Sequence, residues 1–211
     1  MRMGTCYIVG AGDFVPLGFA PGADDWLIAA DGGVDALAAV GVKPELLVGD
    51  CDSLAVLPED VPLLRYPVEK DDTDMGLALE EGFARGFRTF AIYGGGGGRE
   101  DHLLANLQSM CRLSRMGACV RMVCRAYTAY AVTDGTLELP ERTAGTLASV
   151  FCNGDRAEGV TLAGLHYPLN RATLTCDRPL GVSNHYVGGR ASVTVERGTL
   201  LALVYHEEKY A

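Results

Sequence analysis

The chain has few basic residues for its size. Of its 211 residues, 18 are Lys or Arg and 27 are Asp or Glu, which gives a formal net charge of −9. A protein that binds nucleic acid needs a basic surface to release counterions from phosphates, and the Lys and Arg residues here form no such cluster. The charge balance therefore argues against nucleic acid as a partner.

Long hydrophobic runs are also missing. No apolar stretch approaches the roughly 18 residues expected of a membrane-spanning helix. The N-terminus passes from Met1 into the short apolar segment Tyr7–Val9 with no signal-peptide pattern. We therefore expect a cytoplasmic protein that does not associate with a membrane.

Cysteine and histidine are present but lack the spacing of a metal site. The seven cysteines include no Cys-x-x-Cys pair, and the four histidines are scattered, so no zinc pattern is found. With 48% hydrophobic and 21% charged residues, the composition is that of a globular protein, which excludes disorder, collagen and coiled coil.

The first part of the chain alternates strand and helix patterns. Its apolar runs are continuous, as in strands buried on both faces of a parallel sheet. They are Cys6–Val9, Trp26–Ala30, Leu46–Val48, Leu63–Val68 and Phe90–Tyr93. Apolar residues at helical spacing predict helices near 34–38, 75–83 and 103–114. This alternation predicts a doubly wound parallel α/β sheet over residues 1–132.

Beyond Val132 the pattern changes to strands alone. Residues 191–195 alternate apolar and polar side chains, and a turn at Arg197-Gly198 is expected to lead into a second strand over 200–205. Further strands are predicted at Thr146–Cys152 and Ala172–Cys176. Residues 133–211 are therefore expected to form a small all-β sandwich or barrel.

Polar residues follow four strands of the first domain where each strand ends. These segments are Asp31-Gly32-Gly33, Gly49-Asp50-Cys51-Asp52-Ser53, Lys70-Asp71-Asp72-Thr73-Asp74, and five glycines followed by Arg99-Glu100-Asp101-His102. In an open α/β sheet, ligands bind beyond the carboxyl ends of the strands. We therefore expect these segments to share one edge of the sheet.

That edge suits a polyphosphate bound with a metal ion. Mg²⁺ takes carboxylate oxygens together with phosphate oxygens, and Asp50 and Asp52 can reach the same side of an extended loop. Lys70 and Arg99 can meet phosphate charge. Glycines 94–98 let backbone N–H groups approach a phosphate at the start of a helix. Carboxylates crowded at one edge repel each other, and a bound cation relieves that repulsion.

Each segment also has a structural explanation when taken alone. Asp and Gly are common turn residues, and Asp72, Thr73 and Asp74 are suited to capping the following helix. Gly10-Ala11-Gly12 is half of a dinucleotide-binding fingerprint, but Val15 stands at the third glycine position. The four segments together favour ligand binding over turn chemistry.

In their order along the chain, these segments resemble the thiamine pyrophosphokinase family. ADGG, GVKPELLVGDCDSL, KDDTD and GGREDHLLANLQ are similar to its catalytic domain, and GLHYPL and GVSNHY to its β domain. The resemblance implies transfer of a pyrophosphoryl group from ATP to the hydroxyl of thiamine, which gives thiamine diphosphate and AMP. It also implies a homodimer with the thiamine site between subunits.

Matching positions carry the family's roles onto this sequence. Mg²⁺ would be held by Asp50, Asp52 and Asp74. ATP would contact Asp31, Lys70, Thr73, Arg99 and Asp101, and thiamine would contact Ser183 and Asn184. Arg99 would act in catalysis, and Asp71 or Asp74 would accept the proton of the thiamine hydroxyl, a choice that the sequence leaves open.

Four positions depart from the family's pattern, and two other functions stay open. Gly96 and Gly97 replace bulkier residues, Glu100 replaces an apolar residue, and His185 replaces an acidic one. One alternative is a metal-dependent phosphohydrolase acting on a nucleotide or pyrophosphate, which leaves the β domain without a role. The other is a non-catalytic sensor of a nucleotide or thiamine derivative, against which the retained Lys70, Arg99 and carboxylates argue.

Overall fold

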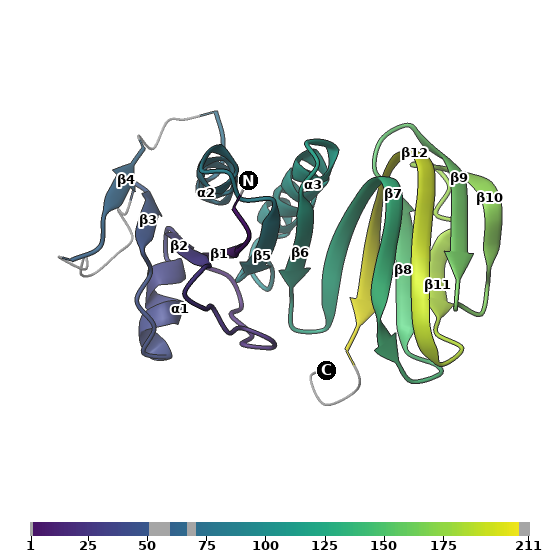
Figure 1. The fold of residues 1–211 in the computed structure, drawn as a ribbon, viewed down its shortest axis with the longest axis horizontal. Coiled ribbons are helices and arrows are strands. Elements are labelled where there is room, and N and C mark those ends of the chain that lie inside the picture. The colour runs from purple at the N-terminus through teal and green to yellow at the C-terminus, as the bar shows by residue number, and fades with distance from the viewer. Residues whose placement is uncertain (1, 51–59, 67–70, 207–211) are drawn as a thin grey trace. The chain divides into compact units, whose positions relative to one another are not determined.

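The computed structural model describes residues 2–50, 60–66 and 71–206 of the chain. Contacts divide the chain into two units (Figure 1). Unit 1 comprises Met1–Ser109 and Val120–Arg125, and unit 2 comprises Met110–Cys119 and Ala126–Ala211. Residue 132, after which the sequence pattern changes to strands alone, lies within strand β7 (Tyr127–Arg142).

Unit 1 is built on parallel strands. They are β1 (Thr5–Val9), β2 (Trp26–Ala30), β3 (Leu46–Gly49), β4 (Leu63–Arg65), β5 (Thr89–Tyr93) and β6 (Cys119–Val123). Their order is β6-β5-β1-β2-β3-β4. β1 pairs in parallel with β2 and β5, and β3 pairs in parallel with β2 and β4. The continuous apolar runs therefore predicted β1, β2, β3 and β5 correctly, and β2 and β3 are buried along their whole length. The run Leu63–Val68 is a strand only over Leu63–Arg65 within the described residues, and β6 was not predicted.

The prediction of a doubly wound sheet goes further than the structure supports. The described helices are few, namely α1 (Gly33–Ala39), α2 (Asp74–Ala84) and α3 (Glu100–Arg115), and residues 10–25, which connect β1 to β2, contain none. Side chains of that loop instead pack on the sheet. Phe19 lies edge-on to Tyr7 and Tyr93, with ring centroids 5.6 and 5.1 Å apart. An aromatic loop thus covers part of the sheet where a doubly wound fold would have a helix.

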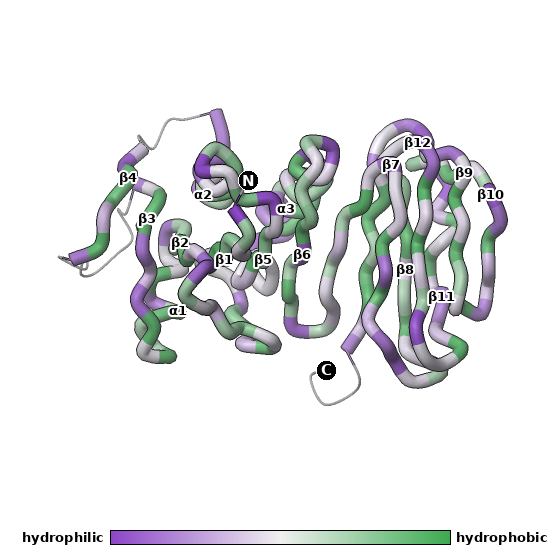
Figure 2. Tube along the Cα trace, in the orientation of Figure 1, coloured by the Kyte–Doolittle hydropathy of each residue, from purple (hydrophilic) through white to green (hydrophobic). Residues whose placement is uncertain are grey.

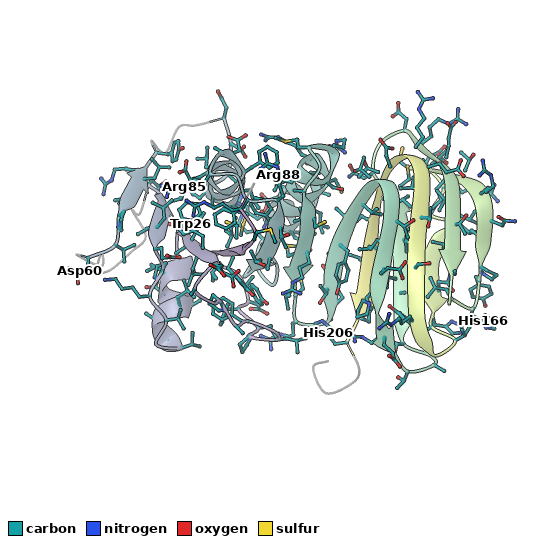
Figure 3. All side chains as sticks on the ribbon, in the orientation of Figure 1. Trp26, Asp60, Arg85, Arg88, His166 and His206 are labelled. Carbon is teal, nitrogen blue, oxygen red and sulfur yellow. The ribbon has the colours of Figure 1, made fainter. Side chains whose placement is uncertain are left out.

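Two cation–π contacts stabilise the edge of unit 1 opposite the carboxyl ends of the strands. The Arg85 guanidinium lies 4.2 Å from the centre of the Trp26 ring, and that of Arg88 lies 3.7 Å from the centre of the Phe83 ring (Figure 3). Such contacts contribute about 0.5–1 kcal/mol each when exposed.

Within the described ranges, every helix is too short or too polar to cross a membrane.

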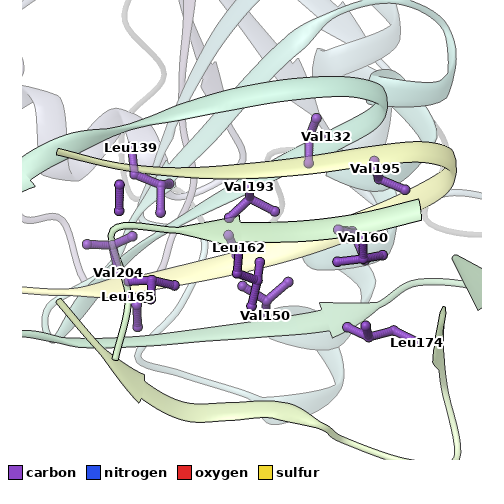
Figure 4. Packing of buried hydrophobic residues seen from close by; sticks show 14 of the residues in the cluster. Val132, Leu139, Val150, Val160, Leu162, Leu165, Leu174, Val193, Val195 and Val204 are labelled. Carbon is purple, nitrogen blue, oxygen red and sulfur yellow. The ribbon is translucent and has the colours of Figure 1, made fainter. Parts of the chain in front are cut away.

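Unit 2 contains a second, all-β domain. Its strands are β7, β8 (Leu147–Cys152), β9 (Arg156–Ala163), β10 (Leu169–Thr175), β11 (Gly181–His185) and β12 (Gly189–Tyr205). All pairs between them are antiparallel. Hydrophobic and hydrophilic residues alternate along β7 and β12 (Figure 2). The inward-facing residues, among them Val150, Leu162 and Val193, form one buried cluster (Figure 4).

The turn expected at Arg197-Gly198 is wrong. β12 runs unbroken from Gly189 to Tyr205, and its register against β7 shifts between Val195 and Thr199. Gly198 has a φ of +115°, and its N–H donates to Asp134 Oδ1 at 2.7 Å. The glycine therefore marks a β-bulge, which bends a strand without ending it. Before the bulge β12 pairs with β9, and after it with β8.

Candidate functional site

A cavity of about 560 Å³ opens where the strands of unit 1 end. Segments that follow β1, β2, β3 and β5 meet there with the first turns of α2 and α3. The lining residues are Gly10, Ala11, Gly12, Ala30, Asp31, Asp50, Asp72, Thr73, Asp74, Met75, Gly94, Gly95, Gly96, Gly98, Arg99, His102 and Asn106. Parallel strands bring the strand-end segments to one edge, as the sequence predicts.

Three predicted acidic residues line this cavity together. Asp31, Asp50 and Asp74 come from the ends of β2 and β3 and from the start of α2. Gly49 lies between them, because a Cβ placed there would sit 3.2 Å from Asp74 Oδ1 and 3.4 Å from Asp31 Cα. The glycine thus lets acidic residues from two other segments approach the end of β3.

The donor set fits Mg²⁺ shared with phosphate rather than held by protein alone. In the described part of the chain, no group of three or more His, Cys, Asp or Glu residues lies close enough to enclose a metal ion. Mg²⁺ typically binds one or two carboxylates together with substrate phosphates and water. Asp31, Asp50 and Asp74 around Gly49 could supply such carboxylates. Asp52 and Lys70, also predicted for this site, lie outside the described residues.

The start of α2 combines a structural role with a place in the cavity wall. Thr73 is the helix N-cap, since its Oγ1 accepts a hydrogen bond from the Gly76 N–H at 3.0 Å. Asp72 Oδ1 accepts from the Thr73 N–H at 2.7 Å. The capping interpretation is therefore confirmed for Thr73, which also lines the cavity. Asp71 is exposed and is not part of the lining.

Two glycine-rich loops form another wall. The Gly10 N–H donates to the Tyr93 carbonyl at 2.8 Å, and the Gly12 N–H donates to the Gly94 carbonyl at 2.9 Å. A Cβ on Gly12 would lie 2.7 Å from the Gly94 oxygen, closer than van der Waals contact allows. Gly10-Ala11-Gly12 thus belongs to the site although it lacks the full dinucleotide fingerprint, because it must approach the second loop closely.

Helix α3 adds two polar residues that the sequence analysis did not single out. His102 and Asn106 both line the cavity, and they lie four residues apart on the helix. The Asn106 side chain is buried, and its Nδ2 donates to the Gly95 carbonyl at 2.8 Å. His102 is the last residue of the Arg99–His102 segment, and its spacing of four from Asn106 is the signal that indicates a shared helix face.

Arg99 stands at the cavity in an ion pair with Asp101. Its Nη2 and Nε donate to the two oxygens of the Asp101 carboxylate, at 2.5 and 3.1 Å. The hydrogen bonds from Arg99 lower the pKa of Asp101 to about 2. Both side chains are exposed, and only Arg99 is part of the lining. Asp101 therefore holds the arginine, and its predicted contact with ATP stays a prediction.

In unit 2, Asn184 joins the two motifs that resemble the family's β domain. The buried side chain accepts from the Tyr167 N–H at 2.9 Å and donates to the Tyr167 carbonyl at 2.8 Å. The neighbouring Ser183 is exposed and has a φ of +57°. The rings of His166 and His185 stack with centroids 4.5 Å apart, and Tyr167 lies edge-on to both. His166 is labelled in Figure 3.

Comparison with known proteins gives matches to both parts of the chain. Residues 22–122 match the family model "Thiamin pyrophosphokinase, catalytic domain", and residues 135–200 match "Thiamin pyrophosphokinase, vitamin B1 binding domain". A curated protein named thiamine pyrophosphokinase, from Bacillus subtilis, is 26% identical over 182 residues, which is 83% of this chain and 85% of the relative.

Solved structures share the fold of this chain. The crystal structure of thiamine pyrophosphokinase from Bacillus subtilis has a TM-score of 0.85 at 23% identity, covering 96% of this chain and 99% of that chain. The corresponding structure from Geobacillus thermodenitrificans has a TM-score of 0.84 at 24% identity, covering 98% and 100%. At these identities the structures establish a common fold.

Proposed function

Because the chain belongs to the thiamine pyrophosphokinase family, we propose that it transfers the pyrophosphoryl group of ATP to thiamine, giving thiamine diphosphate and AMP. The strand-end cavity carries this proposal. It gathers Asp31, Asp50 and Asp74, the glycine run 94–98 and Arg99, all from the region that matches the family's catalytic domain, together with the Gly10–Gly12 loop that precedes that region. A phosphohydrolase would use the same cavity but would leave the second matched domain without a role. A non-catalytic sensor of a nucleotide or thiamine derivative would have no need of the carboxylates and Arg99 that line the cavity.

The cavity residues divide into those that face phosphate charge and those that hold a cation. Arg99 and the backbone N–H groups of the glycine run would bind the terminal phosphates of ATP. Asp50 and Asp74, with Asp52 from outside the described residues, would hold Mg²⁺, and Asp31 would bind ATP or the metal. When bound, Mg²⁺ would neutralise charge on the phosphate oxygens.

The reaction needs a proton acceptor for the thiamine hydroxyl. Its oxygen would attack the β-phosphorus, the bond from that phosphorus to the bridging oxygen of the α-phosphate would break, and AMP would leave. Asp74 lines the cavity, whereas Asp71 is exposed outside the lining, which favours Asp74 as the acceptor. Positioning and charge neutralisation would supply most of the catalysis, as in phosphoryl transfer generally.

We place thiamine at the β domain, in a homodimer whose active site draws on both subunits. Ser183 would contact thiamine directly, and Asn184 would act by holding Tyr167, an exposed aromatic ring beside it. Mixing an Asp50→Asn protein with a Tyr167→Ala protein should then restore part of the lost activity. A fully active monomer in light scattering would contradict this arrangement.

The cytoplasm is the compartment that we propose, without nucleic-acid or membrane partners.

Phosphorus NMR of the protein with ATP and Mg²⁺, with and without thiamine, tests the function. We expect AMP and thiamine diphosphate to form only when thiamine is present. Phosphate or pyrophosphate release without thiamine would support the hydrolase, and absence of turnover would support the sensor. Early ADP together with thiamine monophosphate would mean attack at the γ-phosphorus and would overturn pyrophosphoryl transfer.

A further inference from the structure

The side chain of Asp13 occupies the space where Gly97 would carry a Cβ. Gly97 has a φ of +79°, and a Cβ on it would lie 2.5 Å from Asp13 Oδ2 and 2.6 Å from Asp13 Cβ. The Asp13 N–H also donates to the Gly96 carbonyl at 2.7 Å. The backbone of Asp13 therefore contacts Gly96, and its side chain contacts Gly97. Both glycines directly precede Gly98, which lines the cavity.

Arg125 holds the carboxylate of Asp13 that lies against Gly97. Its Nε donates to Asp13 Oδ2 at 3.0 Å. Arg125 follows Cys124, whose Sγ lies 3.2 Å from where a Cβ on Gly96 would be. The two residues after β6 thus support the glycine run in two ways. Cys124 packs against Gly96, and Arg125 holds the Asp13 carboxylate that lies against Gly97.

We propose that Asp13 is a positioning residue for ATP: by filling the space above Gly97 while Arg125 holds its carboxylate, it fixes the turn that sets Gly98 and Arg99 at the cavity. This inference rests on the proposed function for its ligand. It also accounts for glycine at position 97, where the family resemblance calls for a bulkier residue, because any side chain there would overlap Asp13.

The test compares variants that differ in volume and in charge. Asp13→Ala empties the space above Gly97, whereas Asp13→Asn keeps the volume and an oxygen that can accept from Arg125. The matched control is Asp60→Ala, which removes the exposed carboxylate of the Lys43–Asp60 ion pair in the same unit (Figure 3). Each protein is examined by amide hydrogen exchange of residues 94–99 without ligand, by calorimetry with MgATP, and by steady-state kinetics.

Asp13→Ala should speed exchange at residues 94–99 and raise both the Kd and the KM for ATP about tenfold, because misplacing a group at the site by about 1 Å can cost up to about a hundredfold. The KM for thiamine and the melting temperature should stay unchanged, which a merely structural role would not give. Asp13→Asn and Asp60→Ala should behave as the wild type. Should Asp13→Ala fold poorly, Arg125→Ala, at an exposed residue, should give the same shifts in exchange and Kd.

Unchanged exchange and unchanged ATP affinity in Asp13→Ala would overturn the proposal. So would an Asp13→Asn protein that behaves as Asp13→Ala, because charge and not packing would then be what matters. If the wild type makes no AMP from ATP and thiamine, the proposed function fails instead. Exchange and MgATP affinity do not depend on turnover, so they still decide the role of Asp13.

Discussion

The two units place their candidate functional residues in opposite ways. In unit 1, the acidic residues and Arg99 stand beyond the ends of paired strands, above a core formed by the strands themselves. In unit 2, Ser183 and Asn184 lie within β11, and the Asn184 side chain is buried and hydrogen-bonded to backbone. Under the proposed function, the acidic residues and Arg99 of unit 1 would act in catalysis without contributing to the core, whereas Asn184 of unit 2 would serve both binding and stability.

Asp50→Asn tests this separation with the largest expected effect. We expect kcat/KM to fall roughly a thousandfold, the scale seen when a charge-stabilising group is removed from an active site. Melting should stay unchanged or rise, because Asp50 lies near other acidic residues and outside the core. Asp35→Asn, at an exposed acid of α1, is the matched control and should leave the activity unchanged. Wild-type activity of Asp50→Asn at limiting Mg²⁺ would refute the metal assignment.

Asn184→Ala should affect stability and activity together. The change leaves the N–H and carbonyl of Tyr167 without their partner, so the free energy of unfolding should fall by about 2–3 kcal/mol. The KM for thiamine should rise and that for ATP should not. Urea unfolding and kinetics measure both, with Asn170→Ala on β10 as an exposed control. A rise in the KM for thiamine with no loss of stability would show that Asn184 serves binding alone, and the contrast between the two units would fail.

Tyr186→Phe should stabilise unit 2 without changing activity. Tyr186 is 1% exposed, and within the described chain its hydroxyl has no hydrogen-bond partner. Removing a buried hydroxyl of this kind should raise the free energy of unfolding by about 1 kcal/mol. Urea unfolding at pH 8 measures it, and a loss of stability would show that the hydroxyl has a partner.

The same tyrosine gives a pH dependence whose sign is fixed. Burial raises its pKa from 10.0 to about 12. The folded state therefore holds the proton more tightly than the unfolded state, and this contribution is complete below pH 10 and is lost as the pH rises to about 12. Unfolding measured between these pH values should show a steeper loss for the wild type than for Tyr186→Phe.

Asp101→Asn should have the smallest effect. Both members of the Arg99–Asp101 pair are exposed, and exposed pairs contribute little to stability, so melting should not change. The KM for ATP should rise a few-fold because Arg99 is held less firmly. The pKa of about 2 means that this role persists down to that pH. Glu100→Gln, at the neighbouring exposed acid, should leave the KM unchanged.

The sequence predicts the part of the site that depends on local pattern. Continuous apolar runs identify β1, β2, β3 and β5, and the parallel arrangement then brings Asp31, Asp50 and Asp74 to one edge. The Thr73 cap is equally local, since it requires only a hydroxyl three residues before Gly76. Local signals of this kind are read without knowing which distant segments meet.

What the sequence did not reveal depends on partners far along the chain. Gly10-Ala11-Gly12 gains its role from contact with Gly94, and Asp13 gains its role from Gly97 and Arg125. The Arg197-Gly198 pair signals a turn by composition, yet its glycine forms a bulge because β7 continues alongside and Asp134 accepts from it. Such contacts are set by the tertiary structure, so they produce no periodic pattern in the sequence from which they could be predicted.

The pairing of β12 has a consequence for the order in which the molecule folds. This strand joins β7, β8 and β9, and it aligns Tyr127 with Tyr205. The earlier strands of unit 2 therefore lack their central neighbour until β12 docks, and closing such distant contacts is slow. We expect the refolding kinetics of unit 2 to end in a slow step whose rate is set by the docking of β12.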